Sequence, residues 1–293
     1  MTTARTRDLL VVAERITAAL PPVVEEVVLT GSVSRGAADD LSDIELLVVT
    51  TETLDLATSF EHARTVGLER LDTWGVQGTA ASRVSGYYGR VPVELVWWPR
   101  DHAETCVAAL LAGEQSSLGD ALVHGVALRT VGLLEAWQER LRAYPEGLAA
   151  ARIEEAALTW GGFAAAGMLT LARPGDRLVL AERLLDDSTR VLRLVYALNR
   201  EWQPTGKRLA ERVRALHVRP ERLAERIEQA LTEPDALRAL LVMSELQAET
   251  VALAPSGPNV DRARRWLDEV LDVLREAHYA RSLLPRGLSP YGD

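Results

Sequence analysis

Cysteine is nearly absent from this chain of 293 residues, since Cys106 is the only one. A single thiol excludes a disulfide within the chain and a metal site built on several thiolates. The scarcity of cysteine favours a reducing compartment, so we expect a cytoplasmic protein. Lysine is equally scarce: Lys207 is the only one, and all other basic side chains apart from histidine are arginine. The single lysine is therefore worth following as a candidate functional residue.

Long hydrophobic runs and excess positive charge are also missing. No run of about 18 apolar residues occurs, and charged residues interrupt the first 20 positions, so neither a membrane span nor a secretory signal peptide is expected. The formal net charge is −9 and the pI about 5.2. Proteins that follow nucleic-acid phosphates usually carry a basic surface. We therefore expect no stable nucleic-acid partner and no membrane partner.

The residues that are present describe a globular chain with two different halves. Hydrophobic residues make up 47% and charged residues 26%, which is ordinary for a soluble domain. β-branched runs predict strands at 23–30, 43–50, 83–88 and 91–98, the last two forming a hairpin around Gly89-Arg90. Helical spacing of apolar residues predicts helices at 5–20 and 54–66.

Strand signals stop at about residue 100, and the remainder is expected to be helical. Predicted helices cover 101–112, 118–142, 148–172, 177–201, 206–216, 220–231, 234–253 and 260–280. We therefore predict an α+β fold, in which an N-terminal domain with a mixed sheet (1–145) precedes an all-α helical bundle domain (146–293). The boundary is expected near Tyr144-Pro145.

Two carboxylates on the second predicted strand carry the first chemical signal. Asp43 and Glu45 are two positions apart, so on a strand they project from the same face, while Ile44 and Leu46 point to the other. Two neighbouring carboxylates repel each other, and a divalent cation relieves that repulsion. Oxygen ligands of this kind suit Mg²⁺. The pair therefore predicts a metal site.

A third carboxylate and a preceding loop complete the predicted site. Glu94 is the single acid in the apolar strand 91–98, and an ionised acid in such a strand needs a partner. If the two strands are neighbours, three carboxylates can hold two metal ions that promote displacement at a phosphoryl group. Gly31 and Ser32 offer backbone amides and a hydroxyl to phosphate oxygens, and Arg35 can add a charge-assisted contact.

With these residues the sequence resembles the nucleotidyltransferase superfamily related to DNA polymerase β. The closest likeness is to aminoglycoside nucleotidyltransferases of the kanamycin type. It rests on Gly31-Ser32-Val33-Ser34-Arg35, Ser42-Asp43-Ile44-Glu45 and Val93-Glu94-Leu95, and covers roughly residues 25–100. The resemblance implies a polymerase-β-like N-terminal domain. It also implies two Mg²⁺ ions, an NTP co-substrate (ATP in the first instance) and a homodimer.

The same resemblance suggests roles for residues of the helical half. Related helical domains often carry an Asn…Trp/Tyr…Lys segment whose lysine reaches the triphosphate, and Lys207 takes that place here. A pair of glutamates opens the helical half in the kanamycin type, and Glu154-Glu155 lie at the comparable point. The position one turn later, where that type takes a base, reads Ala157-Leu158. We therefore expect Glu94 to act as the base.

The expected activity is Mg²⁺-dependent transfer of a nucleoside monophosphate, AMP in the first instance, from an NTP to a hydroxyl of a small molecule, with release of pyrophosphate. An aminoglycoside-like antibiotic or a sugar-like metabolite is the expected acceptor, and antibiotic resistance one expected role. The alternative is a toxin–antitoxin or regulatory nucleotidyltransferase that modifies a protein or tRNA. A catalytically silent binding protein is a third reading.

Overall fold

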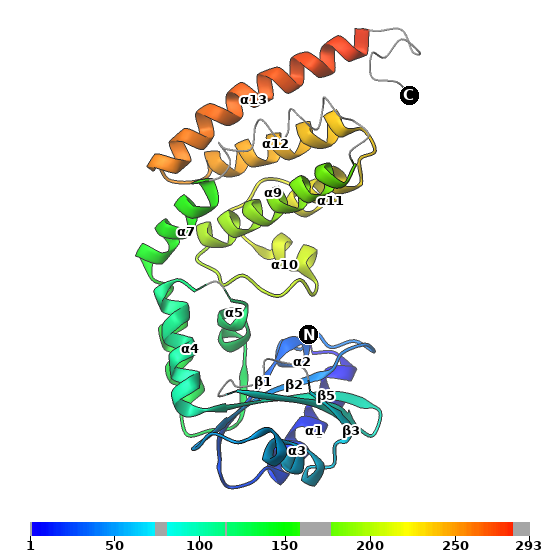
Figure 1. Cartoon of the computed structure of the whole chain (residues 1–293), viewed down its shortest axis with the longest axis vertical. Helices are drawn as coiled ribbons and strands as arrows, with labels where there is room; N and C mark the ends of the chain where they lie inside the picture. The colour runs from blue at the N-terminus through cyan, green and yellow to red at the C-terminus, as the bar shows by residue number, and fades with distance from the viewer. Residues whose placement is uncertain (1, 74–80, 115, 159–176, 284–293) are drawn as a thin grey trace. The chain divides into compact units, whose positions relative to one another are not determined.

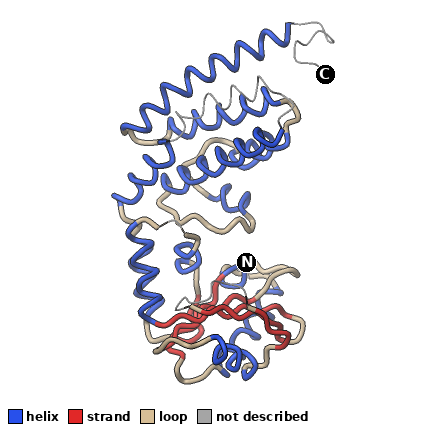
Figure 2. Tube along the Cα trace, in the orientation of Figure 1, coloured by secondary structure: helices blue, strands red, loops and turns tan. Residues whose placement is uncertain are grey.

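The chain forms two compact units, Met1–Tyr144 and Pro145–Asp293. The computed structural model describes residues 2–73, 81–114, 116–158 and 177–283 (Figure 1). The first unit contains all the strands of the described chain and the second contains helices alone (Figure 2). This arrangement confirms the predicted α+β class with a helical C-terminal half. Among the described residues, no helix combines the length and apolar character needed to cross a bilayer.

A six-stranded mixed sheet organises the first unit. Its order is β3-β4-β5-β2-β1-β6. The central strands β2 and β5 run parallel, and the other pairs are antiparallel. The strands are β1 (Val24–Thr30), β2 (Ile44–Thr50), β3 (Glu69–Asp72), β4 (Ser82–Tyr88), β5 (Val91–Pro99) and β6 (Val126–Arg129).

The two faces of this sheet are covered by different helices. One face packs its alternate apolar side chains, such as Ile44, Leu46 and Leu95, with Leu9 and Ala63 in a common buried cluster. Leu9 belongs to α1 (Ala4–Ala19) and Ala63 to α3 (Leu56–Thr65). The other face carries Glu45 and Glu94 and lies on the side of α5 (Leu118–Val123) (Figure 1). The remaining helices of this unit are α2 (Gly31–Ser34), α4 (Arg100–Ala112) and α6 (Leu133–Arg142).

The single helix predicted over 118–142 is wrong. Strand β6 separates α5 from α6 and pairs with β1 at the edge of the sheet. Gly125 and Gly132 flank this strand, and Gly132 has a φ of +93°, a conformation that ends a regular helix and suits glycine. The short strand β3 was also missed, because Glu69-Arg70-Leu71-Asp72 is mostly exposed and lacks an apolar alternation. Edge strands need little apolar surface because only one side pairs.

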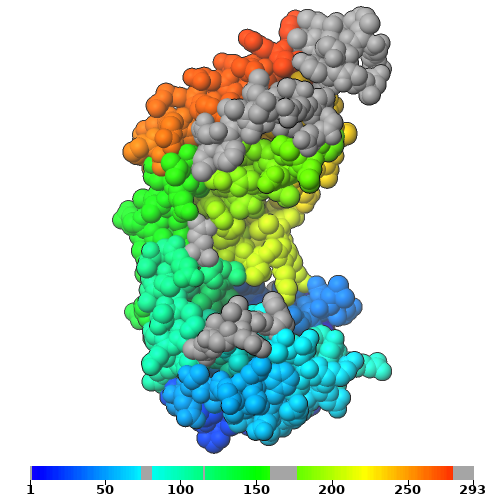
Figure 3. Space-filling model, viewed as in Figure 1, coloured from blue at the N-terminus to red at the C-terminus, as the bar shows by residue number. Residues whose placement is uncertain are grey.

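The second unit is built around a separate apolar core. Its buried residues, from Ile153 to Leu274, share no member with the core of the first unit. Helix α12 packs against α9, α11 and α13, and α13 forms one outer edge of the unit, drawn orange to red in Figure 3. The predicted segment 159–172 lies outside the described residues. The described helices are α7 (Glu146–Leu158), α9 (Arg177–Leu198), α10 (Leu209–Ala215), α11 (Leu223–Thr232), α12 (Ala236–Ala252) and α13 (Pro258–Leu283).

Candidate active site

Glu45 and Glu94 are direct neighbours across the two central strands. In the parallel pairing of β2 with β5, Glu45 is the register partner of Glu94. Neighbouring strands lie about 4.8 Å apart, and register partners share a face. Both side chains are half-buried, whereas the flanking residues on the opposite face, Ile44 and Leu95, are completely buried. The predicted site requires the strands of Glu45 and Glu94 to be neighbours, and the fold contains this pairing.

Asp43 enters the same region from a tight turn. It immediately precedes β2 and is half-buried, two positions before Glu45, the spacing that places side chains on one face. The turn is closed by Ser42 and Asp39: the Ser42 hydroxyl donates to the Asp39 carboxylate at 2.9 Å and accepts from the Asp39 amide at 2.9 Å. Asp39 therefore has a role in the turn that precedes Asp43.

The short helix α2, which begins at Gly31, lies close to Glu45. A Cβ on Gly31 would lie 2.7 Å from Glu45 Oε2, and the φ of Gly31 is +72°. Only glycine combines this backbone conformation with this approach. This segment is held by its own hydrogen bonds, from the Ser34 hydroxyl to the Gly31 carbonyl and from the Ala37 amide to the Ser32 carbonyl. Gly31 therefore lies beside one of the predicted metal acids.

The Glu94 carboxylate has a cationic neighbour on the adjacent strand. Arg83 Nε lies 3.3 Å from Glu94 Oε1, and both side chains keep part of their surface exposed. In the pairing of β4 with β5, Arg83 is the partner of Val96, two positions beyond Glu94 on the same face. Arg83 was not predicted as a site residue, because an arginine in a hairpin strand gives no signal until the strand register is known.

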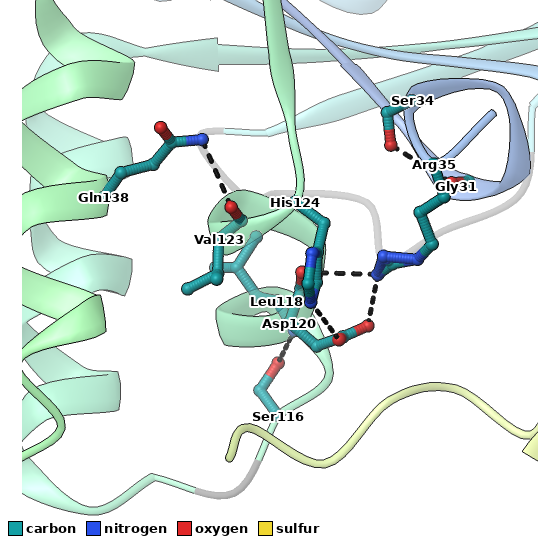
Figure 4. Close-up of polar contacts among 9 residues, drawn as sticks. All are labelled: Gly31, Ser34, Arg35, Ser116, Leu118, Asp120, Val123, His124 and Gln138. Atoms are coloured by element: carbon teal, nitrogen blue, oxygen red, sulfur yellow. Dashed lines mark hydrogen bonds and ion pairs between the residues drawn. The ribbon is translucent and has the colours of Figure 1, made fainter. Parts of the chain in front are cut away.

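Arg35 is engaged with a residue far away in the sequence. Its Nη2 donates to Asp120 Oδ2 at 2.6 Å and to the Asp120 main-chain oxygen at 3.3 Å (Figure 4). The Asp120 side chain is only 7% exposed, and its other carboxylate oxygen lies 3.7 Å from His124 Nε2. The sequence pattern predicted Asp120 inside a helix over 118–142, where an acidic residue gives no signal of a distant partner.

The carboxylates suit Mg²⁺ in chemical kind, and Glu45 and Glu94 share one face of the sheet. Gly31 brings the loop backbone against Glu45, leaving no room for a side chain between them. Within the described part of the chain, no three or more His, Cys, Asp or Glu side chains are gathered closely enough to hold a metal ion as they stand. Of the three proposed ligands, Glu94 is paired with Arg83, and this ion pair would have to open for Glu94 to bind an ion.

The helical unit contains the remaining predicted residues. Lys207 lies in the segment just before α10, and Trp202 in the same segment is buried. Glu154 has a structural role: its carboxylate accepts from the Asn259 amide at 2.8 Å, at the start of α13. A Cβ on Gly257 would collide with the same carboxylate. Glu154 thus joins two helices of the second unit.

Comparisons with known proteins add little to this geometry. No protein-family model matches the chain, and no curated protein matches it. One solved structure to which the chain is similar is a nucleotidyltransferase-like protein from Exiguobacterium sibiricum 255-15. The identity is 12%, and the match covers 98% of this chain and 97% of that chain with a TM-score of 0.40. At this identity and TM-score, the similarity does not assign a function to the chain.

Proposed function

We propose that the protein is a Mg²⁺-dependent nucleotidyltransferase that moves a nucleoside monophosphate from an NTP, ATP in the first instance, to a hydroxyl of a small molecule. One observation supports this above the others. Glu45 and Glu94 are register partners on parallel central strands, and the Gly31 backbone packs against the Glu45 carboxylate. Glu45, Glu94 and the Gly31 backbone are part of the donor set that the proposed reaction uses.

Asp43, Glu45 and Glu94 are the proposed ligands of two Mg²⁺ ions. When bound, the ions would neutralise charge on the phosphates and on the oxygens that attack and leave. Gly31, Ser32 and Arg35 are proposed to bind the β- and γ-phosphates through amide, hydroxyl and guanidinium donors. Lys207 is proposed to contribute a further positive charge to the triphosphate.

Glu94 is proposed to take the proton from the acceptor hydroxyl. That oxygen then forms a bond to the α-phosphorus, and the bond from the α-phosphorus to the bridging oxygen breaks as pyrophosphate leaves. Arg83 Nε lies 3.3 Å from Glu94 Oε1, so a guanidinium stands beside the proposed base. The ion pair between Arg83 and Glu94 must open before Glu94 can act both as a metal ligand and as the base.

We propose an aminoglycoside-like antibiotic or a sugar-like metabolite as the acceptor. The motif likeness to the kanamycin type supports this choice, and so does the net charge of −9, which suits a polycationic substrate. A homodimer is proposed on the same likeness. Modification of a protein or tRNA is the other outcome that the test must distinguish.

The test is to incubate the protein with Mg²⁺, each NTP and a panel of aminoglycosides, lincosamides and amino sugars, and to follow pyrophosphate release and product mass. We expect Asp43→Ala, Glu45→Gln and Glu94→Gln each to lower the rate by at least about a hundredfold. The matched control is Glu69→Gln, an exposed acid on strand β3 of the same sheet. Release that survives Asp43→Ala would refute the metal assignment, and labelling of protein or tRNA alone would move the acceptor to a macromolecule.

A further inference from the structure

We propose that Asp120 is a positioning residue for nucleotide binding, which acts by holding the Arg35 guanidinium in the free protein. This inference rests on the proposed function and adds a residue to it that no sequence motif indicates. The contact joins the loop after α2 to α5, two segments separated by 85 positions in the sequence.

Two hydrogen bonds hold Arg35 to Asp120, and the same nitrogen donates both. Nη2 donates both to the Asp120 carboxylate and to the main-chain oxygen of the same residue, at 2.6 and 3.3 Å (Figure 4). A charge-assisted bond of this length is among the stronger side-chain contacts. Because Asp120 is buried and belongs to a helix, it is a fixed acceptor, and the direction of the guanidinium is fixed with it.

A second nitrogen of the Arg35 guanidinium, Nη1, makes no hydrogen bond among the described residues. This nitrogen is buried, while the side chain as a whole is 22% exposed. A buried donor without an acceptor is costly, and native structures rarely leave one without a reason. An anionic oxygen, such as that of a phosphate in the adjacent Gly31-Ser32 loop, would satisfy it.

Asp120 has two opposing influences on nucleotide affinity. Asp120 carries a negative charge, which repels a triphosphate, but it also restrains a long side chain whose ordering otherwise opposes binding. The bond of 2.6 Å already neutralises the charge locally, so the restraint is expected to dominate. Removing Asp120 should therefore weaken nucleotide binding, and should do so only while Arg35 is present.

A double-mutant cycle tests this, with binding of α,β-methylene-ATP in Mg²⁺ measured by calorimetry for the full chain. We expect Arg35→Ala to raise the Kd about 10- to 100-fold and Asp120→Ala to raise it about 3- to 10-fold. In the Arg35→Ala background, Asp120→Ala should change the Kd less than about twofold. The kcat at saturating nucleotide should stay within about twofold of the wild type, since a positioning residue acts on binding.

Two control variants separate positioning from general loss of structure. Glu25→Ala removes an ion pair of similar length, 2.7 Å to Arg100, in the same unit. His124→Ala removes the weaker partner of Asp120 and leaves the Arg35 contact. Both are expected to leave the Kd of the analogue unchanged. If Asp120→Ala does not fold, Asp120→Asn carries the test, because its carbonyl still accepts from Arg35 and a smaller rise in Kd is expected.

The experiment distinguishes a failure of the role of Asp120 from a failure of the proposed function. A tighter Kd in Asp120→Ala, or the same rise in both backgrounds, overturns the positioning role and leaves the proposed function intact. If the wild-type protein binds no analogue with any Mg²⁺ concentration, the proposed function fails, and the role of Asp120 fails with it.

Discussion

Gly31 is the residue at which backbone conformation and the site are most tightly linked. Replacing it with alanine adds strain at a φ of +72° and places a Cβ 2.7 Å from Glu45 Oε2. We expect Gly31→Ala to displace the Glu45 carboxylate and to reduce Mg²⁺-dependent pyrophosphate release at least about tenfold, with a loss of stability of about 1–2 kcal/mol.

Gly36 supplies the matched control for this substitution. Its φ is also +72°, but an added Cβ would meet nothing closer than Thr2 Oγ1 at 3.4 Å. Gly36→Ala should therefore cost a similar amount of stability, measured by thermal unfolding, and retain most of the activity. Equal loss of activity in the two variants would show that backbone strain alone, and not the contact with Glu45, explains the effect.

Site residues could be predicted from the sequence where the pattern that marks them is local. Asp43 and Glu45 are two apart on one strand, and Glu94 stands alone in an apolar run, so each could be noticed without knowledge of the fold. Arg83 and Asp120 could not, because their relevance arises from strand register and from a contact across 85 positions. The chemical roles of all these residues stay predictions until the variants are measured.

Among the elements, helix α6 depends on a carboxylate from strand β1. Glu26 is fully buried, and its oxygens accept from the Val131, Leu133 and Leu134 amides and from the Thr130 hydroxyl. A negative charge at a helix start is favourable, and the amides there have no partner within the helix. Glu26 is thus a buried acid on the face of Glu45 with a structural role.

We expect Glu26→Ala to lower the free energy of unfolding by about 3 kcal/mol, because several buried donors lose their acceptor. Glu26→Gln, which retains one carbonyl oxygen, should cost less. The control is the neighbouring Glu25→Ala, which removes only the partly exposed pair with Arg100 and should cost about 1 kcal/mol or less. Denaturant unfolding of the three variants gives the comparison, and an equal cost for Glu25 and Glu26 would contradict the capping role.

Helix α9 carries a buried ion pair and an exposed one in succession. Burial raises the pKa of Asp187, and Arg183, 2.7 Å away, offsets this only in part. Since the folded pKa lies above the unfolded value of 3.8, the folded state binds the proton more tightly. The associated stability is present below about pH 3.8 and is lost as the pH rises through the folded pKa.

Asp187→Asn removes this titration. We therefore expect the stability of the variant relative to the wild type to increase between pH 4 and pH 7, measured by denaturant unfolding at several pH values. Asp186→Asn is the control, because Asp186 pairs with Arg190 on the same helix at the same spacing but is 43% exposed. A relative stability of Asp187→Asn that falls with rising pH would show that the pairing with Arg183 outweighs burial.

The periodic spacing of apolar residues predicts long helices and strands better than short ones. The long helices and the central strands have apolar spacing that burial requires, and they were predicted within a few residues. Strand β6 was lost inside a predicted helix because Val126-Ala127-Leu128-Arg129 is too short to establish a period of two. Its pairing with β1 depends on the sheet already being formed, and that information is tertiary.

For the molecule as a whole, two separate cores imply two units that can be studied apart. Because the buried cluster of the sheet unit and the side chains packed against it come from residues 9–128, we expect a protein of residues 1–144 to unfold cooperatively on heating. Under the proposed function it retains the loop and the three acids and should bind α,β-methylene-ATP with Mg²⁺. It lacks Lys207, so its affinity should be lower than that of the full chain.

The size of that loss can be predicted from a single substitution. If Lys207 is the contribution of the helical unit to the triphosphate, Lys207→Ala in the full chain and removal of residues 145–293 should raise the Kd by the same factor, about 10- to 100-fold. Arg265→Ala, an exposed cation on α13, controls for the change in net charge and should have no effect. If truncation raises the Kd strongly and Lys207→Ala does not change it, other residues of the helical unit hold the nucleotide. Lys207 would then be a solvated side chain without a role in binding.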